Sequence, residues 1–220
     1  APLNRVEHVP FPVVLFFIAK GGANSSLGGA GMARSPVSNV LIYEDLAHGD
    51  MAMALGAVSP LAFVNTLLDA GSDAQREKYL PLFCDGEFRA ATTALLEPRA
   101  TFEPSEPQMT ASASSGGYSL SGTKVMVPLG MDAELLLVIA QLESKGPAAF
   151  IVEGSPDGLT RTAEANMGLH GAQLATLTFD NVQLSQDALL GDGDFDLQRF
   201  LDLSRLGICT LAIGTCQAVL

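Results

Sequence analysis

Asp202 and Arg205 are the residues of this sequence whose types and spacing most clearly suggest a binding site. A spacing of three residues places both side chains on one face of a predicted helix. The guanidinium of Arg205 stays charged and offers several donors in one plane, which suits phosphate or carboxylate groups. The same spacing also allows a local ion pair that contributes only a few tenths of a kcal/mol. The sequence leaves both interpretations open.

The other reactive side chains do not combine into a recognisable catalytic or metal site. We expect His48 to lie at the C-terminal end of a helix, where a cation is favoured, and His170 to be structural. The histidines, cysteines and acidic residues match no metal-ligand spacing, and no G-x-S-x-G nucleophile motif is present. The sequence therefore predicts no catalytic residue and no metal ligand.

The composition limits the class of protein and its partners. The chain has 220 residues, is 48% hydrophobic and carries a formal net charge of -12. Such an acidic chain lacks the clustered basic residues that nucleic-acid binding requires, so an anionic ligand must be met by local donors such as Arg99 or Arg205. The apolar run from Phe11 to Ala19 is shorter than the ~20 residues of a membrane span, so no membrane span is expected.

The three cysteines show no metal spacing and are odd in number. We interpret them as reduced, structural thiols of a cytoplasmic protein, because disulfides are rare in that compartment. They are Cys84, Cys209 and Cys216.

The hydrophobic period changes twice along the chain and predicts three regions. Residues 1–87 are expected to be helical, with helices near 36–49, 51–69 and 73–79. Ser35 is the expected cap of the first of these helices, and Ser72 or Asp73 is the expected cap of the last. Residues 88–191 show a period of two and turns rich in glycine, which predicts a β-domain that is a barrel or a two-layer sheet. Residues 192–220 return to a helical pattern from Phe195. Strands are expected at 92–96, 118–120, 124–127, 135–140, 148–152 and 174–179.

Six short motifs in the middle of the chain resemble, in order and spacing, the acyl-CoA dehydrogenase family. They are Lys78-Tyr79-Leu80-Pro81, Leu96-Glu97-Pro98, Ser121-Gly122-Thr123-Lys124, Met167-Gly168-Leu169-His170-Gly171, Phe179-Asp180-Asn181-Val182 and Leu189-Leu190-Gly191. The resemblance covers about residues 36–220. It implies an α+β fold in which the end of an N-terminal helical domain precedes a middle β-domain and the first helix of a C-terminal helical bundle.

The resemblance also implies an activity. Members of this family remove two hydrogens across the α–β bond of an acyl-CoA thioester in fatty acid metabolism, including β-oxidation. A glutamate takes a proton as general base and FAD accepts a hydride. Electron-transfer flavoprotein is the implied electron acceptor, and homo- or hetero-oligomers with related subunits are implied. Asp202 and Arg205 match the family's Asp-x-x-Arg, which contacts the acyl-CoA. Ser204 stands where some members carry the base, and it cannot act as that base near neutral pH.

The flavin contacts of the family can be compared with this sequence one by one. Leu96 stands where a threonine is usual, and Phe102 where a serine is usual. Met126 replaces the tryptophan that covers the flavin, and Pro128 replaces a threonine that forms a hydrogen bond. Proline has neither a hydroxyl nor an N–H. Backbone contacts by Ala94, Leu95 and Leu96 remain available, but we expect FAD to bind weakly to this chain alone.

Three functions follow from these comparisons. The first is an FAD-dependent acyl-CoA dehydrogenase. The second is a degenerate subunit without flavin in a heteromeric acyl-CoA dehydrogenase, and the third is an acyl-CoA-binding scaffold without redox activity. The last predicted helix has too few polar positions to face water, which favours association with a copy of the chain or a related subunit.

Overall fold

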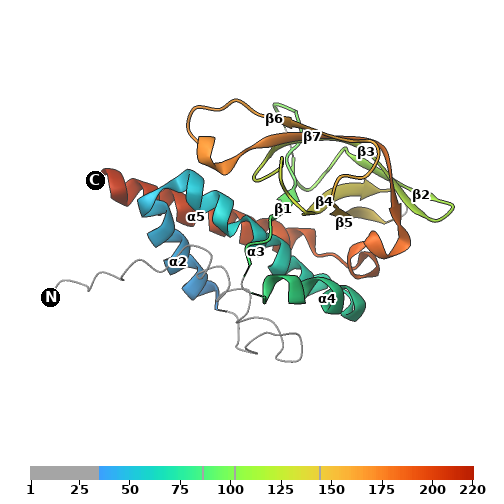
Figure 1. The fold of residues 1–220 in the computed structure, drawn as a ribbon, viewed down its shortest axis with the longest axis horizontal. Helices are drawn as coiled ribbons and strands as arrows, with labels where there is room; N and C mark the ends of the chain where they lie inside the picture. The colour runs from blue at the N-terminus through green and yellow to red at the C-terminus, as the bar shows by residue number, and fades with distance from the viewer. Residues whose placement is uncertain (1–34, 86, 102, 144) are drawn as a thin grey trace.

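The structure, a computed structural model, describes residues 35–220 except for residues 86, 102 and 144. A group of helices packs against a curled, mixed β-sheet that forms half of a barrel (Figure 1). The α-helices are α2 (Pro36–Gly49), α3 (Met51–Ala70), α4 (Asp73–Tyr79) and α5 (Leu197–Val219). The strands are β1 (Ala91–Ala94), β2 (Thr110–Ser114), β3 (Gly117–Val127), β4 (Leu135–Leu142), β5 (Gly146–Glu153), β6 (Leu159–Ala163) and β7 (Ala175–Ser185). The predicted order of helices, β-domain and final helix is confirmed. The apolar run Phe11 to Ala19 lies outside the described residues.

Local capping explains where the first helices begin. The hydroxyl of Ser35 accepts a hydrogen bond from the backbone N–H of Ser38 at 3.3 Å, as the sequence predicts for α2. At the start of α4, the hydroxyl of Ser72 accepts a hydrogen bond from the backbone N–H of Gln75. The side-chain oxygen of Gln75 accepts one in return from the backbone N–H of Ser72. This reciprocal capping box supplies partners for two donors that the helix itself leaves unpaired. It also identifies Ser72, rather than Asp73, as the cap of α4.

Helix α3 is the central core helix of the described part of the chain. It is long and apolar enough to cross a membrane by length and composition, and 61% of its most apolar window is buried inside the protein. Leu61, Phe63 and Leu67 are almost fully buried in the core that the helices share with the sheet. A helix that is apolar all round is expected where it is enclosed by other elements. The burial of α3 therefore accounts for its hydropathy.

Strand β4 separates two hydrophobic cores. It pairs with β1 and β2 in parallel at its two ends and with β5 in antiparallel along its length. Leu135, Leu137 and Ile139 face the core beneath the helices, whereas Leu136 and Val138 face the core inside the curl of the sheet. Successive side chains of a strand point to opposite faces. Both faces of β4 are therefore buried, which explains its nearly continuous apolar sequence.

The sheet contains two strands that the sequence pattern does not predict. They are β2 and β6, whose residues are mostly polar or exposed and show no clean alternation. The predicted strands 118–120 and 124–127 are in fact parts of one strand, β3. A shift in the pairing of β3 with β7 between Leu120 and Gly122 interrupts the alternation there. Gly122 has φ +146°, and a β-carbon on it would collide with Met109.

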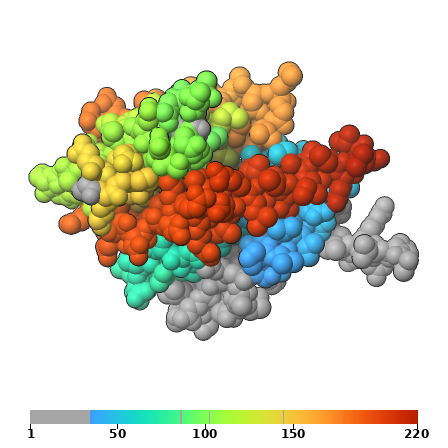
Figure 2. Space-filling model, turned by 180° about the vertical axis from the view of Figure 1, so that it is seen from behind, coloured from blue at the N-terminus to red at the C-terminus, as the bar shows by residue number. Residues whose placement is uncertain are grey.

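Helix α5 packs one face against α2 and α3 and presents the other to solvent. Phe200, Leu201 and Leu211 are buried, and Gly214 comes so close to α2 that a β-carbon would collide with the carbonyl of Glu44. Figure 2 shows α5 running across the molecular surface. The exposed face carries apolar residues at alternating spacings of three and four: Leu206, Cys209, Ile213, Cys216 and Leu220. We call these five residues the α5 seam.

We expect the α5 seam to mediate association of the chain. A seam with this spacing packs well against another helix, and large exposed apolar patches are rare on soluble monomers. Light scattering at about 50 µM, in the range where weak complexes form, should detect assemblies for the unaltered chain. Ile213→Asp should shift the chain toward monomer. Met167→Asp, which places the same charge on a fully exposed loop residue, should not. A monomeric unaltered chain would contradict this expectation.

Candidate functional site

The resemblance to the acyl-CoA dehydrogenase family predicts flavin contacts at the C-terminal ends of β1 and β3. We call the residues Ala94, Leu95, Leu96, Met126 and Pro128 the flavin-facing edge. The structure brings its two segments together, because the backbone N–H of Val125 donates to the carbonyl of Leu96 at 2.9 Å. Ala94 is fully buried, whereas Leu96 and Met126 are 41% and 40% exposed. Phe102 lies outside the described residues.

The side chain of Glu164 accepts a hydrogen bond from a backbone N–H of the flavin-facing edge. Its carboxylate accepts from the backbone N–H of Met126 at 2.8 Å and from the hydroxyl of Thr176 at 2.7 Å. Met126 itself has φ +54°, a conformation that is rare for a residue with a side chain. Glu164 belongs to none of the motifs in the sequence. Its role depends on how the segment after β6 lies against β3, and no local motif indicates it.

The flavin-facing edge does not fit a tightly held flavin. The edge offers apolar side chains at Leu96 and Met126, and Pro128 has neither a hydroxyl nor an N–H. The N–H groups of Val125 and Met126 already have protein partners. The flavin ring carries several polar atoms, and each one that is buried without a partner costs roughly 1–3 kcal/mol. The geometry therefore agrees with the substitutions in predicting weak flavin binding.

A buried ion pair lies directly behind the flavin-facing edge. The ammonium of Lys124 donates to the carboxylate of Glu97 at 2.9 Å and to the carbonyl of Leu95 at 3.0 Å. The side chains of Lys124 and Glu97 are 0% and 4% exposed. Glu97 also accepts from the backbone N–H groups of Gln108 and Met109. Both charged residues belong to motifs of the family, but the sequence alone did not show that they meet.

The surroundings of Glu97 lower its pKa. Burial would raise this pKa, but the backbone N–H groups of Met109 and Gln108, together with Lys124, outweigh burial and bring it below its ordinary value of 4.5. Burial lowers the pKa of Lys124, and the hydrogen bond from its ammonium to Glu97 opposes that effect. Since the folded state favours the ionised form of Glu97, its contribution to stability is present above about pH 4.5. That contribution is lost as the pH falls through the lowered pKa.

Glu97→Gln should therefore reduce both the stability of the chain and its sensitivity to acid. At pH 7 the loss should be about 3–5 kcal/mol, the range for removing one partner of a buried pair. Between pH 6 and pH 4 the variant should lose less of its remaining stability than the unaltered chain, because it lacks the titrating carboxylate. Urea unfolding at both pH values measures this. Glu106→Gln removes an exposed carboxylate and serves as the control; an identical acid dependence of the unaltered chain and Glu97→Gln would contradict the assignment.

Asp202 and Arg205 contact each other on the exposed face of α5. The guanidinium donates to the Asp202 carboxylate at 3.3 Å, and the two side chains are 61% and 58% exposed. The same carboxylate oxygen accepts from the side-chain amide of Gln198 at 2.8 Å. The hydroxyl of Ser204 donates to the carbonyl of Phe200 within the helix. A guanidinium has five N–H donors and the hydrogen bond to Asp202 uses one of them, so Arg205 keeps donors for a ligand.

The loop between β1 and β2 lies near Arg205. Hydrogen bonds from the hydroxyl and the N–H of Ser105 lower the pKa of Glu103, and the positive charge of Arg205 lowers it further. In Figure 2 the green segment that includes this loop borders the orange-red start of α5. The fold therefore brings the start of this loop to the flavin-facing edge and its middle toward the Asp202–Arg205 pair.

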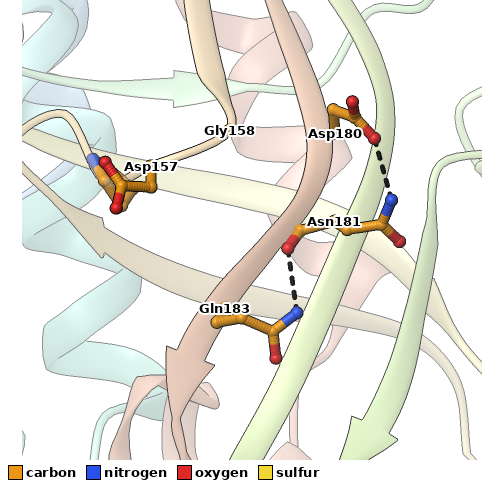
Figure 3. A pocket seen from close by; sticks show the side chains of 6 residues that line it. Asp157, Gly158, Asp180, Asn181 and Gln183 are labelled. Carbon is orange, nitrogen blue, oxygen red and sulfur yellow. Dashed lines mark hydrogen bonds between the residues drawn. The ribbon is translucent and has the colours of Figure 1, made fainter.

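A shallow hollow on the sheet has the wrong chemistry for an anionic ligand. It is lined by Pro156, Asp157, Gly158, Asp180, Asn181 and Gln183 (Figure 3). Two of these residues are aspartates and none is basic, so the hollow would repel phosphate groups. The side chains of Asn181 and Gln183 are already linked to neighbouring protein groups. In the part of the chain that the structure describes, no three potential metal ligands come together.

Comparisons with known proteins agree with the motifs and the fold. Residues 22–87 match the N-terminal domain of acyl-CoA dehydrogenases, and residues 92–182 match their middle domain. The chain is 33% identical to a mitochondrial isovaleryl-CoA dehydrogenase of Pongo abelii over 205 residues, which are 88% of this chain and 48% of the relative. The structure of butyryl-CoA dehydrogenase from Megasphaera elsdenii matches with a TM-score of 0.81 at 29% identity, over 94% of this chain and 57% of the other.

The chain thus spans about half the length of the relatives that it matches. The two domain matches together cover most of its residues and follow the order of its helical and β regions. The motifs, the half-barrel and these matches lead to one conclusion: this chain belongs to the acyl-CoA dehydrogenase family.

Proposed function

We propose that this chain binds an acyl-CoA thioester as part of an acyl-CoA dehydrogenase that carries out α,β-dehydrogenation. The observation that carries the proposal is the open Asp202–Arg205 pair at the start of α5. The pair matches the family's Asp-x-x-Arg motif in spacing, and it lies on a well-formed helix. Names of relatives and of matched structures, such as isovaleryl-CoA and butyryl-CoA dehydrogenase, favour a short acyl chain.

The charge of the chain supports a local role for Arg205. Because the net charge is -12, the protein as a whole repels an anion such as coenzyme A. A ligand with phosphate groups must therefore be bound by a few fixed donors. Arg205 presents a planar guanidinium whose orientation is held by Asp202, and Asp202 is held in turn by Gln198. This arrangement reduces the conformational freedom that Arg205 must lose on binding.

We propose further that the flavin of the assembly is held mainly by another subunit. Leu96, Met126 and Pro128 support this second proposal, because their side chains offer no hydrogen bonds to the polar atoms of a flavin ring. The chain would then complete or support a neighbouring site in a homo- or hetero-oligomer. An electron-transfer flavoprotein is the proposed acceptor of the electrons. A scaffold that binds acyl-CoA without redox chemistry is the second candidate, and it is favoured by the lack of an acid–base residue at Ser204.

Calorimetry and a visible spectrum of the purified chain test the proposal. We expect butyryl-CoA or isovaleryl-CoA to bind with a measurable enthalpy, while the protein as purified shows no flavin absorption. Binding of neither thioester would refute the acyl-CoA role. Flavin absorption equivalent to about one FAD per chain would refute the assignment of the flavin to another subunit. It would not contradict the acyl-CoA role.

A further inference from the structure

We infer that the buried Glu97–Lys124 pair is a positioning element, which holds the loop between β1 and β2 in place and thereby sets the affinity for acyl-CoA. This inference rests on the proposed function for its link to binding. Neither residue is expected to touch the ligand. Both would act through the described residues of the loop, 95–101 and 103–109, which connect the flavin-facing edge to β2.

The pair closes both ends of this loop. Glu97 lies at its start, and its carboxylate accepts from the N–H groups of Gln108 and Met109 at its end, at 3.0–3.1 Å. Lys124, on β3, reaches the carbonyl of Leu95 and the carboxylate of Glu97. Three segments that are distant in sequence therefore meet at two side chains. Each of these hydrogen bonds has a direction, so together they define the path of the loop.

Stability alone is a poor explanation for two charges at this depth. The ammonium and the carboxylate must both lose water, and a buried ion pair is often replaced by apolar residues without loss of stability. An apolar pair could fill the same space, but it could not accept from Gln108 and Met109 or donate to Leu95. What the charges add is the fixed geometry of these backbone groups. This is the property that a binding loop requires.

The middle of the loop lies near the proposed ligand site, since the green segment that includes it borders the start of α5 in Figure 2. Glu103 lies within electrostatic range of Arg205, and the loop is braced by a hydrogen bond from the guanidinium of Arg99 to the carbonyl of Glu106 at 3.3 Å. A shift of the loop would move the Glu103 carboxylate relative to Arg205. An anionic ligand competes with the Glu103 carboxylate for Arg205, so that shift would change the affinity of the ligand.

The double variant Glu97→Leu/Lys124→Met separates positioning from stability. Apolar residues of similar size should keep the chain folded, with a smaller loss of melting temperature than in the single variant Glu97→Gln, which leaves a buried ammonium without its carboxylate. The affinity for butyryl-CoA should nevertheless fall about tenfold or more, since small displacements in a binding site have large effects. Hydrogen exchange at residues 103–109 should become faster. The control variant Lys78→Met/Glu153→Leu removes another Lys–Glu ion pair, which joins α4 to β5 at 2.7 Å. It should change neither the affinity for butyryl-CoA nor the hydrogen exchange at residues 103–109.

The outcomes distinguish this inference from the proposed function. Unchanged hydrogen exchange at residues 103–109 in Glu97→Leu/Lys124→Met overturns the positioning role, whatever the affinity. Faster exchange with an unchanged affinity for butyryl-CoA overturns the link to binding. If the unaltered chain binds no thioester, the proposed function fails, and with it the link to binding. Faster exchange in the double variant but not in the control would then still support Glu97 and Lys124 as the residues that hold the loop.

Discussion

The triple variant Leu96→Thr/Met126→Trp/Pro128→Thr should bind FAD about 100- to 1,000-fold more tightly than the unaltered chain. It restores two hydroxyls, one backbone N–H and one aromatic ring at the flavin-facing edge. Each regained hydrogen bond is worth about 1 kcal/mol, so three or four contacts amount to about 3–4 kcal/mol. Equilibrium dialysis of FAD against both proteins measures the difference.

Pro128→Ala provides a matched control for this prediction. It restores the backbone N–H without the hydroxyl, so its effect should be no more than about tenfold. The position of Met126, with its N–H donated to Glu164, should be unaffected. Sub-micromolar FAD affinity of the unaltered chain would contradict the prediction, because backbone groups would then suffice to hold the flavin.

Arg205→Ala should weaken the binding of butyryl-CoA by about 10- to 150-fold. This range corresponds to about 1.5–3 kcal/mol, the value for hydrogen bonds to a charged group. The melting temperature should change little, because the partner, Asp202, is exposed and an exposed ion pair contributes at most about 1 kcal/mol. Titration calorimetry and thermal unfolding of the same two proteins give both quantities.

Arg199→Ala is the control on the same helix. Arg199 pairs with Asp69 at 3.3 Å and is as exposed as Arg205, so its removal changes the net charge equally. We expect its effect on affinity to be small, as for a general change in charge. Equal affinities of the unaltered chain and Arg205→Ala, with a large fall in melting temperature, would show that Arg205 has a structural role.

The sequence by itself was sufficient for features that depend on neighbours along the chain. The start of α2 at Ser35 follows from a side chain that reaches a backbone N–H three residues away, and the sequence limited the cap of α4 to Ser72 or Asp73, of which the structure shows Ser72. The contact between Asp202 and Arg205 follows from the pitch of one helix. The change of period near residue 88 was enough to separate helices from strands, and the motifs indicated the family.

Other features were beyond local pattern because their cause lies elsewhere in the molecule. The polar strands β2 and β6 form because β3, β4 and β7 offer them paired backbone groups, although their own residues show no clean alternation. The family motifs predict Leu96 and Met126 as flavin positions, and this stays a prediction. The sequence could not show that the N–H of Met126 is already bound to Glu164.

Tertiary structure alone decided which groups meet at the candidate site. Glu97 and Lys124 are 27 residues apart and become an ion pair only because the sheet curls and places β3 behind the end of β1. The same curl brings the loop that carries Glu103 toward Arg205 on α5. Such contacts depend on strand register and on how helices pack against the sheet, and a one-residue change in register would redirect every side chain. Hydrophobic period constrains the type of each element, whereas the distances that govern binding come from the assembled fold.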